Sequence, residues 1–254
     1  MKIKELSRII PMNNSIFFLI ILIFSPSFSY ADDNYQQFLN KYDQLLADYT
    51  KPTSKNGISY TGVNYNSWSK DIRHKEALKL FNSIVTNEVK NKKAFWINAY
   101  NFLTIELIIR EGEKESIKNL ATKNQSAWKR FSWELNGKSY TLDSIEHEIL
   151  RPLGDPSIHF AINCASVSCP DVRNESYRSE TLDTQLKEQI KLALNNKNKG
   201  YKNEGSTVYI HKLFEWFAVD FDNGDVKGWL SKYTDISKNA KLKYLDYDWS
   251  LNDI

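Results

Sequence analysis

The spacing of hydrophobic positions predicts helices along much of the chain. Between positions 33 and 49, aromatic residues and leucine recur every three or four residues, as on one face of an amphipathic helix. The same pattern predicts helices over 67–85, 182–194 and 226–233, with a helical turn over 214–217. Short or alternating apolar runs predict strands over 58–65, 157–162, 207–210 and 241–249.

Residues 91–110 are apolar on nearly every side, which is typical of a helix that is buried over most of its surface. Gly112 follows this segment and is expected to end the helix. Asn98, Asn101 and Thr104 recur at intervals of three, so they form a polar stripe on it. Because buried amides need partners, the stripe is expected either to tie the helix to neighbouring loops or to orient a ligand.

A hairpin and a short helix are predicted after the central helix. Asn136-Gly137 separates two alternating runs, the strongest short-range signal for a hairpin with a type I′ turn. Asp143 follows with Glu146 three residues later, which is the spacing of a capping box at the start of a helix. Pro152 is then expected to end that helix.

Helices mixed with a few strands predict an α+β domain. Its helices are expected to pack around a small, mainly antiparallel sheet, with the buried helix 91–110 at the centre. The sequence contains no internal repeat or low-complexity linker. We therefore expect residues 32–254 to form a single domain.

The first 31 residues have the organisation of a secretory signal peptide. Three basic residues within the first eight positions precede an apolar run at 15–24, and small residues precede the bond after Ala31. The apolar run is about half of the roughly 20 residues that a membrane span needs, so a retained anchor is the weaker interpretation. We expect cleavage after Ala31, export to the periplasm and no stable membrane span in the mature protein.

Composition narrows the class of protein. A chain with 41% hydrophobic and 26% charged residues is an ordinary globular protein. The formal charge of +3 falls to +1 without the signal peptide, which is too close to balance for a nucleic-acid-binding protein. Two cysteines are too few for a miniprotein built on disulfides.

The segment 159–170 (HFAINCASVSCP) holds the most reactive side chains of the sequence. In one interpretation Cys164 is a nucleophile and His159 is its base, since a thiol needs a nearby imidazole to ionise at neutral pH. Strand alternation would place His159 and Asn163 on one face and Cys164 on the other. The chain must therefore turn near Cys164, unless Cys169 reaches His159 through a folded-back loop.

Three other interpretations of this segment remain open. Cys164 and Cys169 can form a disulfide, which an oxidising compartment would favour. In another interpretation His147, His159 and the two cysteines bind zinc, but their spacings match no common zinc motif, and the favoured expectation is a site without metal. Finally, His159 can be a core residue beside inert thiols.

Residues elsewhere in the sequence could complete a site around this segment. Trp96 and Tyr100 flank the polar stripe and would suit the wall of a pocket. Glu146 could orient His159 as the third member of a triad. Phosphate-binding loops and common metal motifs do not occur in the sequence, so no cofactor is expected.

Four motifs in the sequence resemble those of the DUF547 family, a domain of unknown function. They are AFWINAYNFLTI at 94–105, SYTLDSIEHEILR at 139–151, IHFAINCASVSCP at 158–170 and YLDYDWSLN at 244–252. The resemblance, strongest over 93–194, implies that the following residues fall at signature positions of the family: His159, Asn163, Cys164, Ser166, Cys169, Pro170, Trp96, Asn98, Tyr100 and Asn101. It implies little about activity.

A weaker likeness connects the chain with papain- and transglutaminase-type thiol enzymes. Those enzymes set a cysteine at the start of a helix against a histidine on a strand. Here the buried helix has no cysteine, and both cysteines follow the histidine. The catalytic roles of those families are therefore not transferred to this chain.

Two functions are expected from these residues. As a thiol-dependent hydrolase or acyl transferase, Cys164 or Cys169 would attack a carbonyl, His159 would move the proton, and an amide would hold the oxyanion or the ring. The alternative is a non-catalytic ligand- or protein-binding domain with a structural Cys164–Cys169 disulfide. In either case the partner is expected to be a small molecule or a peptide. The expected binding residues are Trp96, Asn98, Tyr100, Asn101, Asn163 and Ser166.

Overall fold

A computed structural model describes residues 30–254, with side chains from residue 33 onward. The predicted signal peptide at 1–31 lies outside this part of the chain, apart from the backbone of its last two residues. Among the residues described, every helix is too short or too polar to cross a membrane.

Nine α-helices and seven strands are assigned within residues 30–254. The helices are α1 (Tyr30–Tyr49), α2 (Tyr65–Trp68), α3 (Ile72–Asn82), α4 (Lys92–Glu111), α5 (Ala127–Arg130), α6 (Leu142–Ser144), α7 (Leu182–Asn195), α8 (Leu213–Trp216) and α9 (Val226–Leu230). The strands are β1 (Thr50–Lys55), β2 (Ile58–Val63), β3 (Ser132–Leu135), β4 (Lys138–Thr141), β5 (Tyr201–Glu204), β6 (Thr207–Ile210) and β7 (Lys241–Tyr244).

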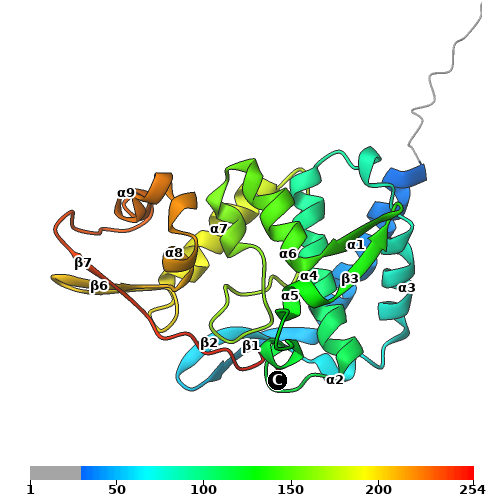
Figure 1. The fold of residues 1–254 in the computed structure, drawn as a ribbon, viewed down its shortest axis with the longest axis horizontal. Helices are drawn as coiled ribbons and strands as arrows, with labels where there is room; N and C mark the ends of the chain where they lie inside the picture. The colour runs from blue at the N-terminus through cyan, green and yellow to red at the C-terminus, as the bar shows by residue number, and fades with distance from the viewer. Residues whose placement is uncertain (1–29) are drawn as a thin grey trace, which may run out of the picture.

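The buried helix α4 lies at the centre of the larger hydrophobic cluster, as predicted. Asn91 caps its first turn by accepting a hydrogen bond from the backbone N–H of Ala94, and Gly112 ends it in the left-handed conformation with φ of 65°. Helices α1 and α3 pack on each other beside it (Figure 1). Phe38 from α1 and Phe81 from α3 meet Phe102 of α4, which builds an aromatic core.

A second hydrophobic cluster occupies the other end of the molecule, around α8, α9 and the β5–β6–β7 sheet (Figure 1). Phe160 and Trp229 stack with ring centroids 5.5 Å apart, and Phe214 and Phe221 pack against them. Ile158 belongs to the first cluster and Phe160 to the second. The segment that carries His159 therefore joins the two clusters.

The strands form three small sheets among the helices, which confirms the α+β class. Two are antiparallel hairpins, β1–β2 and β3–β4, and the third has the order β5–β6–β7 with β6 and β7 parallel. The β3–β4 hairpin turns at Asn136 and Gly137, both with positive φ, as a type I′ turn requires. Strand β1 was not predicted, because its residues are polar and include Pro52, which is tolerated at a sheet edge.

The prediction of a strand over 157–162 was wrong. Residues Pro156–Phe160 form a 3₁₀-helix, with Pro156 in its first turn and the Asp155 side chain accepting a hydrogen bond from the backbone N–H of Ser157. The run is apolar because both clusters bury it, and a short apolar run does not distinguish strand from helix. The strand alternation expected for His159, Asn163 and Cys164 therefore does not apply.

The predicted capping box at Asp143 and Glu146 was also wrong. Thr141 caps helix α6, and Ser144 closes the box through hydrogen bonds of 3.0 and 2.9 Å between side chains and backbone N–H groups. Thr141 ends strand β4, so its extended backbone already has the conformation of an N-cap. The helical path then continues through Pro152 to Gly154, and the Glu146 side chain is free for another role.

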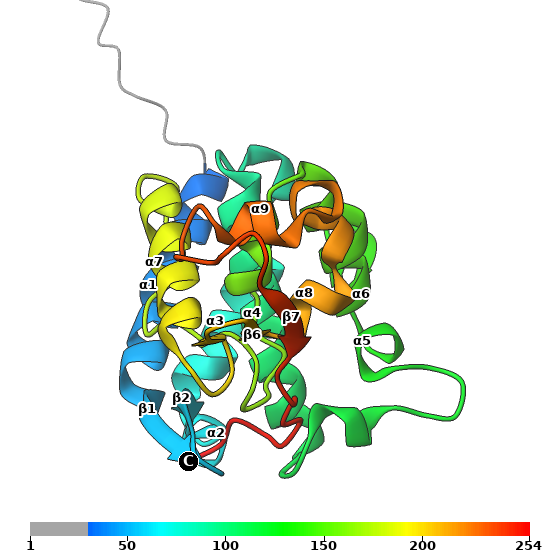
Figure 2. The same ribbon diagram turned by 90° about the vertical axis from the view of Figure 1, so that its left-hand side faces the viewer.

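Two other predicted elements are shorter than expected. The helix predicted over 67–85 is divided into α2 and α3, because Asp71 starts a new helix by accepting a hydrogen bond from the backbone N–H of Arg73. The closing strand pairs only as far as Tyr244. The chain then continues to β1 and β2, where Asp253 bridges to Val63 (Figure 2).

Two amides of the polar stripe on α4 hold neighbouring segments. Asn98 donates to the hydroxyl oxygen of Tyr35 and to the carbonyl of Tyr177, and it accepts from the backbone N–H of Tyr177. Asn101 binds the backbone at Ala161 and Asn163. The third member, Thr104, bonds within its own helix.

Replacing Asn98 with alanine is therefore expected to lower the stability of the fold. The substitution leaves the buried backbone N–H and carbonyl of Tyr177 without partners, which costs about 1–3 kcal/mol. Urea unfolding measures this loss, with Lys92→Ala, a substitution of an exposed residue at the start of α4, as the control. A change in the free energy of unfolding no larger than that of the control would contradict the structural role.

Candidate functional site

A cavity of about 260 Å³ lies where the two hydrophobic clusters meet. Its walls come from α4, the helical segment that follows α6, the loop at 161–170, α8 and the C-terminal segment. We call residues 161–170 the cysteine loop. Tyr100, Glu146, His159, Cys164 and Cys169, all selected from the sequence, line this one cavity.

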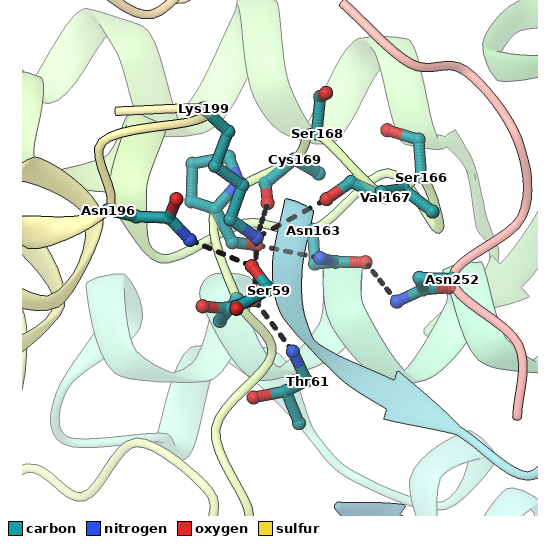
Figure 3. A network of polar contacts seen from close by, with 12 residues as sticks. Ser59, Thr61, Asn163, Ser166, Val167, Ser168, Cys169, Asn196, Lys199 and Asn252 are labelled. Carbon is teal, nitrogen blue, oxygen red and sulfur yellow. Dashed lines mark hydrogen bonds and ion pairs between the residues drawn. The ribbon is translucent and has the colours of Figure 1, made fainter. Parts of the chain in front are cut away.

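In the cysteine loop, asparagine side chains form the backbone hydrogen bonds that a helix or a sheet would otherwise provide. Asn101 of α4 donates to the carbonyl of Ala161 and accepts from the backbone N–H of Asn163, at 2.9 and 2.8 Å. Asn163 donates to the carbonyl of Pro170 at 2.7 Å and accepts from the backbone N–H of Ala165. Figure 3 shows Asn163 in the loop, with Asn252 beside it and joined to it by a hydrogen bond. These contacts close the loop into a tight turn around Cys164.

The two thiols face each other inside this turn. Both cysteines are free, and a hydrogen bond joins their sulfur atoms at 3.0 Å. The backbone N–H of Cys164 also donates to the sulfur of Cys169 at 3.0 Å. Ser166 and Tyr247 place their hydroxyl groups 3.2 and 3.3 Å from the sulfur of Cys164. Cys164 is partly exposed to the cavity, whereas Cys169 is buried.

These contacts separate the acidities of the two thiols. The hydrogen bond with Cys169, supported by those with Ser166 and Tyr247, lowers the pKa of Cys164 from 9.0 to about 7. Burial, together with the hydrogen bond and charge of Cys164, raises the pKa of Cys169 well above its usual value. Cys164 is therefore the thiol of the pair that ionises near neutral pH, and nucleophilicity belongs to the thiolate.

Glu146 shares the cavity with Cys164. Its side chain is buried and accepts a hydrogen bond from the hydroxyl of Tyr100 at 3.3 Å, while the indole N–H of Trp128 donates to that same hydroxyl at 3.1 Å. Burial, and secondly the negative charge of Cys164, raise the pKa of Glu146 from 4.5 to about 7. Glu146 can therefore hold or release a proton near neutral pH.

His159 lies in the cavity wall, but its imidazole bonds to Asp220 and not to Cys164. Its Nε2 is 2.8 Å from a carboxylate oxygen of Asp220, and Arg151 binds both oxygens of the same carboxylate at 2.7 and 2.9 Å. Its ring stacks on Phe217 with centroids 4.2 Å apart. Burial lowers the pKa of His159 to about 4, so the ring is neutral at pH 7 and its Nε2–H donates to Asp220.

Aromatic residues from distant segments form another part of the cavity wall. Trp216 of α8 packs against Tyr247 and Trp249, and Trp249 also meets Trp128. Trp216 is 45% exposed, so the aromatic wall reaches the surface. Tyr247 and Trp249 lie in one of the motifs noted in the sequence, but nothing in their spacing indicated contact with Cys164.

The remaining expected site residues lie outside the cavity lining. Trp96 packs against Tyr140 in the first cluster, and Asn98 holds Tyr177. Asn101 and Asn163 support the loop from behind. Within residues 30–254, no three histidine, cysteine, aspartate or glutamate residues are arranged to hold a metal ion.

Sequence reasoning did not identify three residues that shape the site. Asp220 orients His159, and Tyr247 contacts the sulfur of Cys164. His211 also lines the cavity; its Nε2 binds the carbonyl of Ser168, and its Nδ1 accepts from a backbone N–H. All three lie more than 40 residues beyond the cysteine loop in the sequence, so local patterns carry no signal for their contacts.

The raised pKa of Glu146 predicts a specific pH dependence of stability. Folded Glu146 binds its proton more tightly than the unfolded chain, so this group destabilises the fold as the pH rises from about 4.5 to about 7. Glu146→Gln removes that dependence. Relative to wild type, the variant should gain about 2–3 kcal/mol of unfolding free energy between about pH 4.5 and pH 8, measured by urea unfolding. Parallel stability curves for the two proteins would contradict the buried, protonated carboxyl.

Comparison with known proteins identifies one family. Residues 86–192 match the model of a family described as "Protein of unknown function, DUF547". Comparisons with curated proteins and with solved structures gave no match. The matched segment contains α4, Glu146 and the whole cysteine loop, while Asp220, Tyr247 and most of the aromatic wall lie beyond it. Residues 86–192 of this chain therefore belong to the DUF547 family.

Proposed function

We propose that the cavity is a thiol-dependent acyl-transfer site in which Cys164 is the nucleophile. The observation that carries this proposal is the set of hydrogen-bonding groups around one partly exposed sulfur: the Cys169 thiol and the hydroxyl groups of Ser166 and Tyr247. Such a set favours the thiolate at neutral pH. A buried cysteine with only a structural role would not require hydrogen-bonding groups around its sulfur.

In the proposed reaction the Cys164 thiolate attacks the carbonyl carbon of an ester, thioester or amide. A carbon–sulfur bond forms, the leaving group departs as an alcohol, thiol or amine, and the acyl group remains on Cys164 as a thioester. Water then hydrolyses the thioester, or an acceptor nucleophile takes the acyl group. The hydroxyl groups of Ser166 and Tyr247 lie beside the sulfur and can donate to the oxyanion.

We assign the proton transfer to Glu146, in place of the role expected for His159. Glu146 interacts electrostatically with Cys164 and has a pKa of about 7, so it can take the thiol proton and return it to the leaving group. His159 donates its Nε2–H to Asp220. In this proposal the histidine supports the cavity wall together with Phe217.

Acylation by p-nitrophenyl acetate tests the nucleophile. Wild-type protein should form an acetyl adduct that peptide mass spectrometry locates on Cys164, and Cys164→Ser should lose it. Cys169→Ser should still carry the adduct on Cys164, because serine retains a hydroxyl that can donate to the sulfur. Absence of the adduct from wild-type protein whose thiols are demonstrably free would contradict the proposal.

The same assay, run with two leaving groups, tests the proton carrier. Glu146→Gln should slow the release of ethanol from an ethyl ester by at least about tenfold, because ethoxide must be protonated as it leaves. It should have much less effect on p-nitrophenolate, which leaves without a proton. An equal effect on both esters would contradict the assignment, and a larger effect of His159→Gln on the ethyl ester would return the role to the histidine.

A second candidate function is a non-catalytic binding domain with a Cys164–Cys169 disulfide. The separation of 3.0 Å between the sulfur atoms favours it, since little movement would be needed for bond formation. Both thiols would lose their protons, and two electrons would pass to a disulfide-bearing oxidoreductase of the compartment. Thiol titration of the exported, unreduced protein should find no free thiol in this case, and replacing both cysteines with serine should leave binding intact.

We also propose that the protein is exported to the periplasm as a single domain. The proposal rests on the basic and apolar N-terminal residues and on the small residues before the bond after Ala31. An oxidising compartment would make the redox state of the two thiols decisive for the choice between the two functions.

A further inference from the structure

Lys199 is buried against the second half of the cysteine loop. Only 2% of the residue is exposed, and its ammonium group donates to the carbonyls of Val167 and Cys169 at 3.3 and 2.9 Å. It also pairs with the carboxylate of Asp171 at 2.7 Å. Figure 3 shows the contacts from Val167 and Cys169 converging on the lysine nitrogen.

The surrounding backbone fixes the position of this ammonium group. Gly200, the next residue, lies so close to the last turns of α7 that a Cβ atom would be 1.7 Å from the carbonyl oxygen of Ala193. On the other side, the Asp171 carboxylate accepts a hydrogen bond from the backbone N–H of Thr61 in β2. Lys199 therefore connects α7 and β2 with the second half of the cysteine loop.

The contact with Cys169 is the one that matters for the chemistry. Lys199 holds the carbonyl of Cys169, and the Cys169 side chain makes the largest contribution to the acidity of Cys164. The first half of the loop is held independently, by Asn101. Several contacts thus hold the loop, and Lys199 is the side chain that binds the carbonyl of Cys169 itself.

We propose that Lys199 is a positioning residue that holds Cys169 against Cys164, so that the two sulfur atoms stay hydrogen-bonded and the Cys169 thiol can donate to Cys164 once Cys164 is ionised. It touches neither sulfur and acts through the backbone of the loop. This role rests on the proposed function of Cys164 as the nucleophile. A lysine that only stabilised the fold would leave the acidity of Cys164 unchanged once the variant had folded.

The test is the pH profile of Cys164 alkylation by iodoacetamide, followed by peptide mass spectrometry on the full chain. Wild-type protein should show a midpoint near pH 7. Lys199→Met keeps the length of the side chain but removes the ammonium group, and the midpoint should rise by about one pH unit. The double variant K199M/D171N should show the same rise without leaving a buried carboxylate unpaired, and it serves if the single variant does not fold.

Glu106→Gln is the matched control. Glu106 is buried in the first cluster and pairs with His74 at 2.6 Å, away from the cysteine loop. This variant also weakens a buried polar contact and should lower the melting temperature, yet its alkylation midpoint should stay at the wild-type value.

The outcomes separate the two proposals. A wild-type midpoint near 9 would contradict the activated thiol itself, whatever the lysine variants do. A wild-type midpoint near 7 that remains there in folded Lys199→Met or K199M/D171N would overturn the role of Lys199 and leave the nucleophile intact. A rise of the same size in Glu106→Gln would also overturn it, because general destabilisation would then explain the shift.

Discussion

The site depends on which groups form hydrogen bonds with the buried backbone N–H and carbonyl groups of the cysteine loop. Residues 161–170 have no helix or strand ladder, and buried N–H and carbonyl groups without partners are costly. Side chains from distant segments therefore supply the partners: Asn101 from α4, Asn163 from the loop itself, Lys199 from the turn after α7 and His211 from the segment after β6. The C-terminal segment adds backbone hydrogen bonds at Val167 and Ser168.

The hydrogen bonds that hold the loop also determine the chemistry of its two thiols. A loop held at so many points keeps two sulfur atoms within hydrogen-bonding distance, although each thiol is only a weak donor. One thiol is consequently buried and protonated, and the other is partly exposed and acidic. The Glu146 carboxyl beside them keeps its proton until the pH approaches about 7. Proton positions in the cavity are thus set by packing and hydrogen bonds, with no need for a cationic partner.

The sequence predicted well the elements whose signals are local. Helix α4 followed from its apolar surface and its glycine stop, α7 from its periodicity, and the β3–β4 hairpin from Asn136-Gly137. The segment around His159 was misassigned, because burial between two clusters makes a 3₁₀-helix as apolar as a strand. Glu146 was assigned to a capping box because Thr141, two residues before Asp143, was not recognised as the cap.

The sequence pointed to several residues that line one cavity, but it did not predict their contacts. Cys164, Cys169, His159, Glu146 and Tyr100 do share one cavity. Their partners Asp220, Tyr247 and Lys199 come from segments that the fold, and not the sequence order, brings to the loop. A polar stripe on a helix was ambiguous in the sequence, and in the structure its two amides hold backbone at Tyr177 and at the cysteine loop.

The central claim is that the two thiols have different acidities because of their positions in the loop. NMR of protein with isotopically labelled cysteine measures this directly, through the Cβ chemical shifts of both residues as the pH is raised. The account predicts that Cys164 titrates near pH 7 while Cys169 stays protonated far above it. Titration of both residues together near pH 9, the ordinary value, would contradict it.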